Sequence, residues 1–171
     1  MRFILLITVA VTLFASAPSP VSYVDPERFS GLWYEIARTY NRYEKDCVAA
    51  TVEYTLTDAN EYRVNNRCFD SVIGGELIEY EGSAEPAEGQ SMARIDMTYF
   101  WVFTQEYRVV YLAQDYSLAV VCDEAMEQVW IMHRTPQLEK ARLEPILSLL
   151  ETHMDLERLI WTPQDPQGRY K

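Results

Sequence analysis

Few side chains in this sequence are of a type and spacing that could carry out chemistry. His133 and His153 are the only histidines, and neither has a cysteine or carboxylate nearby at ligand spacing. A structural zinc site needs about four ligands. Glu35 alternates with Trp33 and could point inward, but the sequence offers it no identifiable acid–base partner. Phosphate-binding glycine loops and Gly-x-Ser-x-Gly elbows are also missing. We therefore predict no metal, no cofactor and no catalytic residue.

The three cysteines are Cys47, Cys68 and Cys122. In an exported chain, cysteines favour disulfides, and an odd number leaves one over. Cys122 follows two valines and fits a small buried residue, as free cysteines often are. Its alternative is a reactive nucleophile.

The N-terminus has the pattern of a secretory signal over residues 1–17. Arg2 supplies a positive start, residues 3–15 are mainly apolar, and Ala15-Ser16-Ala17 resembles a cleavage site. The first cysteine is Cys47, so no cysteine near this junction could carry a lipid. We expect a soluble exported protein, periplasmic or extracellular and not lipid-anchored. An uncleaved N-terminal anchor is the alternative.

Composition indicates one globular domain. The chain has 171 residues, of which 49% are apolar and 13% aromatic, enough for a core. Net charge is −11, and loss of Arg2 with the leader makes it −12. Such a surface repels phosphate backbones and anionic membranes, so we expect no nucleic-acid partner. We expect no spanning segment after signal removal, and a monomer or weak dimer.

Short alternating segments dominate the chain and predict an all-β protein. Hairpin-length connections join them, without helices in between. This pattern predicts an eight-stranded antiparallel up-and-down barrel, a size able to enclose one small ligand. The predicted strands are residues 33–38, 47–56, 62–68, 76–84, 92–99, 107–113, 117–121 and 129–134.

The pattern changes after these strands. Apolar residues between 138 and 150 fall near helical spacing, and Thr135-Pro136 marks the expected start of one C-terminal α-helix. Pro145 predicts a kink or a restart of that helix. Residues 154–161 are predicted to be extended. The polar segment 163–171 is expected to be a flexible tail.

Three stretches carry a family resemblance. Gly31-x-Trp33 opens the first strand, Asp115-Tyr116 precedes the strand 117–122, and residues 129–136 end in His133-Arg134-Thr135-Pro136. Together, in this order and spacing, they resemble the three signatures of the lipocalins, most like the bacterial (Blc-like) branch. The resemblance covers about residues 25–162, which we take as the domain.

The resemblance implies a closed barrel end made by Gly31, Trp33 and Arg134. There the guanidinium can lie over the indole, a contact worth about 0.5–2 kcal/mol. Relatives with cysteines at both positions imply a Cys47–Cys68 bridge, which leaves Cys122 free. A bulge or a swing of the strand ends is needed to bring those two within the roughly 4.4–6.8 Å Cα separation of a disulfide. Glu35 is expected to be hydrogen-bonded near this floor.

The residues predicted to face inward are apolar, with a few hydroxyls and one amide, which suits a small-molecule site. We expect non-covalent binding, storage or transport of a small hydrophobic ligand, a fatty acid or lysophospholipid. Alternatives are an isomerase-like enzyme, or a secreted interaction module with a filled core that docks a partner through residues 100–103. The predicted ligand-binding residues are Ala37, Tyr54, Val64, Asn66, Ile95, Met97, Tyr107, Val109, Tyr111, Val120, Trp130 and Met132.

Overall fold

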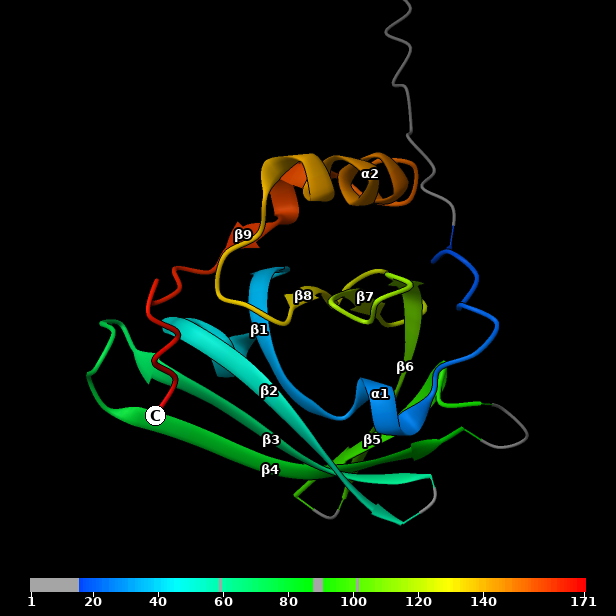
Figure 1. Cartoon of the computed structure of the whole chain (residues 1–171), viewed down its shortest axis with the longest axis horizontal. Coiled ribbons are helices and arrows are strands. Elements are labelled where there is room, and N and C mark those ends of the chain that lie inside the picture. Colours follow the sequence, from blue (N-terminus) through cyan, green and yellow to red (C-terminus); the bar gives the residue numbers. More distant parts are fainter. Residues whose placement is uncertain (1–15, 59, 88–90, 101) are drawn as a thin grey trace, which may run out of the picture.

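A strongly twisted antiparallel sheet closes on itself to form a barrel, with one long helix outside it (Figure 1). The computed structural model describes residues 16–58, 60–87, 91–100 and 102–171. The expected secretory signal, residues 1–17, therefore lies almost wholly outside the described residues. The elements are α1 (Pro26–Phe29), β1 (Gly31–Arg38), η1 (Arg42–Glu44), β2 (Cys47–Asp58), β3 (Glu61–Asp70), β4 (Leu77–Pro86), β5 (Arg94–Tyr99), β6 (Phe103–Leu112), β7 (Leu118–Cys122), β8 (Val129–His133), α2 (Lys140–Leu150), η2 (Leu156–Arg158) and β9 (Ile160–Trp161).

The strands follow one another around the barrel in chain order. Each of β2 to β7 pairs antiparallel with the next strand, and β1 pairs with both β8 and β2 to close the ring. Closure leaves no long strand edge unpaired. The short β9 adds to β1. The predicted eight-stranded barrel with one C-terminal helix is confirmed.

Two β-bulges change which way the following side chains point. In β1, Glu35 lies opposite Met132, but Ala37 lies opposite Ile131, so one residue is inserted between them. In β6 the register shifts in the same way between Val109 and Tyr111. An inserted residue reverses the alternation of every side chain beyond it. The inner faces of β1 and β6 are therefore not continuous in sequence.

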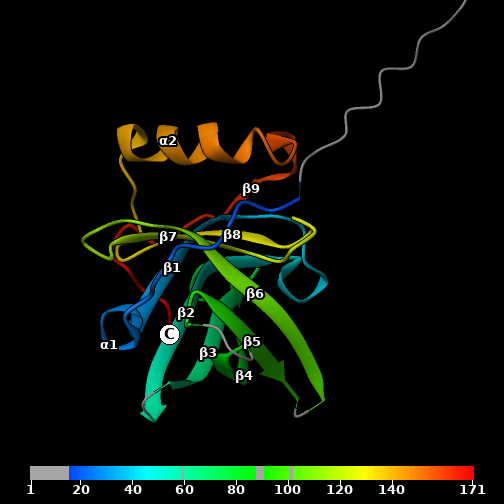
Figure 2. The same ribbon diagram turned by 90° about the vertical axis from the view of Figure 1, so that its right-hand side faces the viewer.

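Two separate apolar layers result. The first fills the lower barrel around Trp33. The second lies between the outer face of the barrel and α2, where Ile146 and Leu150 are fully buried. Figure 2 shows α2 lying across β7 and β8 on the outside. The layer under α2 buries apolar surface outside the barrel and so supplies part of the stabilisation. The barrel interior therefore does not have to be filled completely, and one end of it can stay open.

The helix differs from its prediction. It begins at Lys140 rather than at Thr135-Pro136, because Thr135 is held in a turn by its hydroxyl bond to the Gln137 carbonyl. It runs through Pro145 as one element, so the alternative of a restart there is wrong. Proline removes a single backbone hydrogen bond. Burial of the following residue, Ile146, offsets that loss.

The C-terminal segment is anchored instead of flexible, which corrects the expected tail. The Pro163 carbonyl accepts a bond from the Ala49 amide at 2.7 Å. The Gln164 side-chain amide donates to two carbonyls of β1 and β2, and the Tyr34 hydroxyl donates to the Gly168 carbonyl. The preceding residues 154–161 are not simply extended, because η2 interrupts them. The chain end thus ties β1 to β2.

A disulfide joins Cys47 to Cys68, with Cα atoms 5.4 Å apart. Cys47 lies opposite Asp70, and the pairing of β2 with β3 is irregular between Val48 and Thr51. This irregularity is a bulge that brings Cys47 close enough to Cys68 for the disulfide to form. Cys122 is free and fully buried beneath the helix.

Candidate ligand cavity

The closed end of the barrel is built around Trp33, which is fully buried. The Arg134 guanidinium lies 3.7 Å from the centre of the indole ring and donates to the Leu32 carbonyl at 2.8 Å. It also donates to the Arg28 and Phe29 carbonyls at the end of α1. Burial lowers the pKa of Arg134 to about 10, so it stays charged at neutral pH. Arg134 therefore joins α1 to the barrel floor.

Gly31 is needed for this closure. Its φ angle is +93°, in the left-handed region that glycine tolerates best. A Cβ at this position would lie 3.4 Å from Arg134 Nη1. That distance is an ordinary van der Waals contact, so the backbone angle, and not a lack of space, calls for glycine beside the guanidinium that covers Trp33.

Above this floor lies a cavity of about 540 Å³, within the usual range for small-molecule sites. The loops β1–β2, β5–β6 and β7–β8 contribute to its wall, so it opens at the end away from α1. Exposed aromatic rings, including Tyr40, Phe100 and Phe103, surround the opening. The barrel has one closed end and one accessible end.

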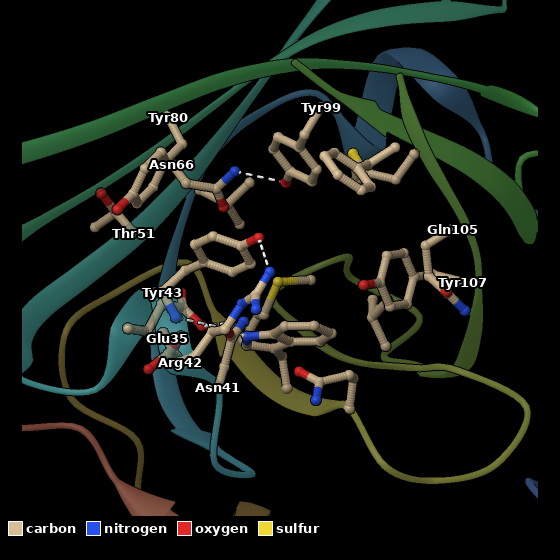
Figure 3. A pocket seen from close by; sticks show the side chains of 18 of the residues that line it. Glu35, Asn41, Arg42, Tyr43, Thr51, Asn66, Tyr80, Tyr99, Gln105 and Tyr107 are labelled. Carbon is tan, nitrogen blue, oxygen red and sulfur yellow. Dashed lines mark hydrogen bonds between the residues drawn. The ribbon is translucent and has the colours of Figure 1, made fainter. Parts of the chain in front are cut away.

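The inner wall is apolar with a few neutral polar groups. Tyr107 and Trp130 pack edge to face with ring centres 5.3 Å apart. The Asn66 amide donates to the Tyr99 hydroxyl at 2.7 Å (Figure 3). Burial raises the pKa of Tyr54 and Tyr99, and that of Tyr107 to about 12. These hydroxyls remain neutral hydrogen-bonding groups.

One side of the wall contains a buried ionic cluster. Arg38 Nε lies 3.4 Å from a Glu35 carboxylate oxygen and 3.9 Å from one of Glu44. The hydroxyl of Thr162 donates to Glu35, and the Trp130 indole donates to Glu44 at 3.3 Å. Burial, with the nearby charge of Glu44, raises the pKa of Glu35 well above its usual range. Burial likewise raises the pKa of Glu44.

Glu35 was expected near the floor, but it lines the open cavity, and its carboxylate accepts a hydrogen bond from Thr162. His133 is buried, with Nη1 of Arg142 in α2 3.3 Å from its Nε2. Among the described residues, no group of three or more His, Cys, Asp or Glu side chains could hold a metal ion. Within the same residues, no helix has the length and apolar character to cross a membrane.

A family model for the lipocalin-like domain matches residues 24–164. The chain belongs to the lipocalin family. The glycine, tryptophan and arginine of its closed end lie where the sequence signatures placed them.

Bacterial relatives match this lipocalin over nearly its whole length. Outer membrane lipoprotein Blc of Escherichia coli K12 is 29% identical, covering 96% of this chain and 98% of the relative. The protein of the same name in Vibrio cholerae is 31% identical, covering 96% and 99%. Temperature-induced lipocalin-1 of Arabidopsis thaliana is 29% identical, covering 84% and 81%.

The names of the bacterial relatives contradict one expectation. They are outer membrane lipoproteins, so the prediction of a protein that is not lipid-anchored is corrected. That prediction depended on an inferred cleavage point near residue 17 and on the lack of a cysteine there. Export to the cell envelope agrees with these relatives.

Solved structures show the same fold. Insecticyanin from the tobacco hornworm Manduca sexta superposes with a TM-score of 0.71 at 22% identity, covering 89% of this chain and 87% of that one. Lobster apocrustacyanin A1 gives 0.66 at 16% identity, covering 88% and 91%. At these identities the likeness concerns the fold alone.

Half of the residues predicted to bind ligand lie in the cavity wall of this lipocalin. Three others lie in the interior core nearer the floor, packed with Trp33, and do not line the open space. The wall residues are Tyr54, Asn66, Met97, Tyr107, Trp130 and Met132. The core residues are Val64, Ile95 and Val109.

The remaining three, Ala37, Tyr111 and Val120, were wrongly placed inside. All three pack in the outer layer beneath α2. The bulges of β1 and β6 turn Ala37 and Tyr111 outward. Val120 belongs to β7, whose five residues are all buried. One face of β7 borders the barrel interior and the other lies under α2, so both faces are apolar. Hydrophobicity in the sequence therefore cannot show which face of β7 points inward.

Several wall residues were missed by the sequence patterns. Tyr99 shares a face with Ile95 and Met97, so alternation could have identified it, and Val121 is the correct inward residue of β7. Tyr80 lies in the predicted strand 76–84, from which no inward residue was chosen. The other loop and rim residues had no periodic signal. They are Tyr40, Asn41, Arg42, Tyr43, Glu44, Phe100, Phe103, Thr104, Gln105 and Gln128.

Proposed function

We propose that this lipocalin binds, stores or transports a fatty acid or lysophospholipid, held non-covalently with its acyl chain in the cavity. The observation that carries the proposal is a largely apolar cavity of about 540 Å³, closed at the Trp33 floor and accessible at the opposite end. Proteins of the lipocalin family bind small hydrophobic ligands, which supports the same class of function.

An acyl chain suits this cavity for a physical reason. Each CH₂ group moved from water into an apolar environment contributes about 0.8 kcal/mol. The flexible side chains of Met97 and Met132, both nearly fully buried, can adapt to chains of different shape. The neutral hydroxyls and the Asn66 amide can orient the ligand without requiring a charge in the interior.

No chemical step is part of this proposal. Burial raises the pKa of the Cys122 thiol to about 12, and that thiol lies outside the barrel beneath α2. A thiol in this state is a poor nucleophile. The buried carboxyl of Glu35 forms an ion pair with Arg38 and accepts a hydrogen bond from Thr162. These contacts give Glu35 a structural role.

Mass spectrometry of the native protein after mild purification tests the function, combined with titration by fatty acids and lysophospholipids. We expect one bound single-chain lipid per protein molecule, and we expect added ligand to displace it. The control is Val121→Trp, which replaces a small side chain of the cavity wall, paired with Val109 of β6, by a large ring that fills part of the cavity. This variant should fold and lose binding. If the parent binds none of the lipids, the carrier function is wrong and the interaction-module alternative replaces it.

A further inference from the structure

Arg42 brings a positive charge to the open end of the cavity. It starts the short helix η1 in the β1–β2 loop, where the Asn41 side chain caps the turn by accepting from the Tyr43 amide at 2.9 Å. Tyrosines apart, the ionisable side chains of the cavity wall are Glu35, Arg42 and Glu44. Figure 3 shows the Arg42 side chain directed into the cavity beside Tyr43.

The two wall carboxylates do not neutralise this charge. Both are within 4 Å of Arg38, which lies behind them and is almost fully buried. In the described part of the chain, Arg42 forms no ion pair with a carboxylate within 4.0 Å. The rim therefore has an unpaired cation, on a protein whose net charge is −11.

Tyr43 holds Arg42 in position. The Arg42 guanidinium donates to the Tyr43 hydroxyl at 2.5 Å and lies 4.6 Å from the centre of its ring. Because that hydroxyl accepts from Arg42, its own proton remains available for donation to a ligand. The guanidinium also keeps free N–H groups on the planar fork that fits carboxylate and phosphate.

We propose that Arg42 and Tyr43 form a head-group site for the anionic carboxylate or phosphate of a single-chain amphiphile. This inference rests on the proposed carrier function and adds a preference to it. The hydrocarbon then runs inward past Trp130 and Met132, which line the wall below. The side-chain amides of Gln105 and Gln128 lie on the same rim and can bond the uncharged parts of the head group.

The site matters because the rest of the surface is acidic. Overall negative charge opposes the approach of an anionic ligand. A charge-assisted bond at the mouth reverses this locally, and salt should weaken it because the rim is exposed. Apolar burial sets the affinity for the chain, whereas Arg42 sets the preference for an anionic head.

The experiment compares ligands that share a chain and differ in the head. One pair is dodecanoic acid and dodecanol, and the other is lauroyl lysophosphatidic acid and monolauroylglycerol. Dissociation constants are measured for the parent, Arg42→Gln and Arg42→Lys at low and high salt. The control is Arg63→Gln, which removes an exposed arginine from β3 outside the cavity wall.

The parent should bind the anionic member of at least one pair more tightly. Arg42→Gln should weaken that binding about tenfold, the effect of a lost bond to a charged group, and leave the uncharged partner unchanged. Arg42→Lys should recover part of the preference, and Arg63→Gln should behave as the parent. Loss confined to the acid identifies a carboxylate site, and loss confined to the lysophospholipid a phosphate site.

Other outcomes overturn the site. If the parent binds all four ligands equally, or if Arg42→Gln keeps the parent's preference, the carrier function stands and the head-group site is wrong. If Arg42→Gln weakens all four ligands alike, Arg42 only supports the loop. If the parent binds none of them, the carrier function fails and the site fails with it.

Discussion

Two tryptophans separate the structural and the functional parts of the barrel. Trp33 is fully buried at the floor under Arg134, whereas Trp130 is partly exposed and lines the cavity. We expect Trp130→Ala to weaken acyl-ligand binding while the protein still folds. Trp33→Ala should cost about 3–5 kcal/mol in free energy of unfolding, as for a buried aromatic replaced by alanine. Fluorescence titration and urea unfolding measure the two effects.

The same pair gives a spectroscopic control. Ligand should change the emission of Trp130 and leave that of Trp33 nearly unchanged, because Trp33 lies below the cavity. Single-tryptophan variants separate the signals. Binding by Trp130→Ala that equals the parent's across the lipid panel would show that the cavity is not the ligand site.

Glu35 makes the free energy of unfolding depend on pH in a defined direction. Burial raises its pKa in the folded state, so the folded protein binds this proton more tightly than the unfolded chain does. The proton on Glu35 contributes its full stabilisation at pH values below the pKa of Glu35 in the unfolded chain. That stabilisation is lost as the pH rises through the higher pKa of Glu35 in the folded protein. Glu35→Gln should flatten this decline, because glutamine cannot ionise. Urea unfolding at several pH values measures the slope.

The exposed Glu61 on the outside of β3 provides the matched control. Glu61→Gln should leave the slope of stability against pH as it is in the parent. A Glu35→Gln slope as steep as the parent's would mean that Glu35 ionises in the folded state as it does in water. In that case the ionic cluster with Arg38 outweighs burial.

At the scale of the strands, alternation predicted the number and order of the elements better than it predicted their inner faces. Trp130 and Met132 were placed correctly because β8 has no bulge. Ala37 and Tyr111 were misplaced because each follows an inserted residue. A bulge depends on the pairing of two strands that are distant in the chain, so the local sequence gives little sign of it.

The β1–β2 loop shows a second limit. Nothing in its sequence indicates that any of its side chains enters the barrel, yet Glu44 accepts a hydrogen bond from the Trp130 indole and lies close to buried Arg38. Loop side chains have no period from which their direction could be deduced. The rim of the cavity, including Arg42, therefore emerges only from the three-dimensional structure.

The disulfide stabilises the β2–β3 hairpin outside the cavity wall. Cys47 and Cys68 pack in a small cluster of their own with Ala50 and Ile78. Replacing both by alanine should lower the free energy of unfolding by about 3 kcal/mol, the chain-entropy estimate for a loop of this length. Binding should be retained. Thiol titration of the unfolded parent should find one free group, and three free groups would contradict the bridge.

At the scale of the whole molecule, an open cavity limits how much core the barrel itself can supply. The interior packs fully only around Trp33, and the second apolar layer lies outside, under Ile146 and Leu150 of α2. Stability therefore depends on elements that never touch the ligand. This arrangement leaves the cavity wall free to vary in residue type while the closed end and the helix maintain the fold.

The C-terminal segment is the last of these external supports. Removal of residues 163–171 eliminates the Pro163 carbonyl bond to Ala49, the two bonds from Gln164, and the Tyr34 bond to Gly168. At about 0.5–1.5 kcal/mol per hydrogen bond, these four bonds predict a loss of about 2–6 kcal/mol in free energy of unfolding. Lipid affinity should stay close to the parent's, because no residue of this segment lines the cavity. Urea unfolding and lipid titration of the truncated protein measure both quantities, with Gln164→Ala as a milder variant of the same kind. A truncated protein that unfolds at the parent's urea midpoint would show that the segment is a free tail in solution after all.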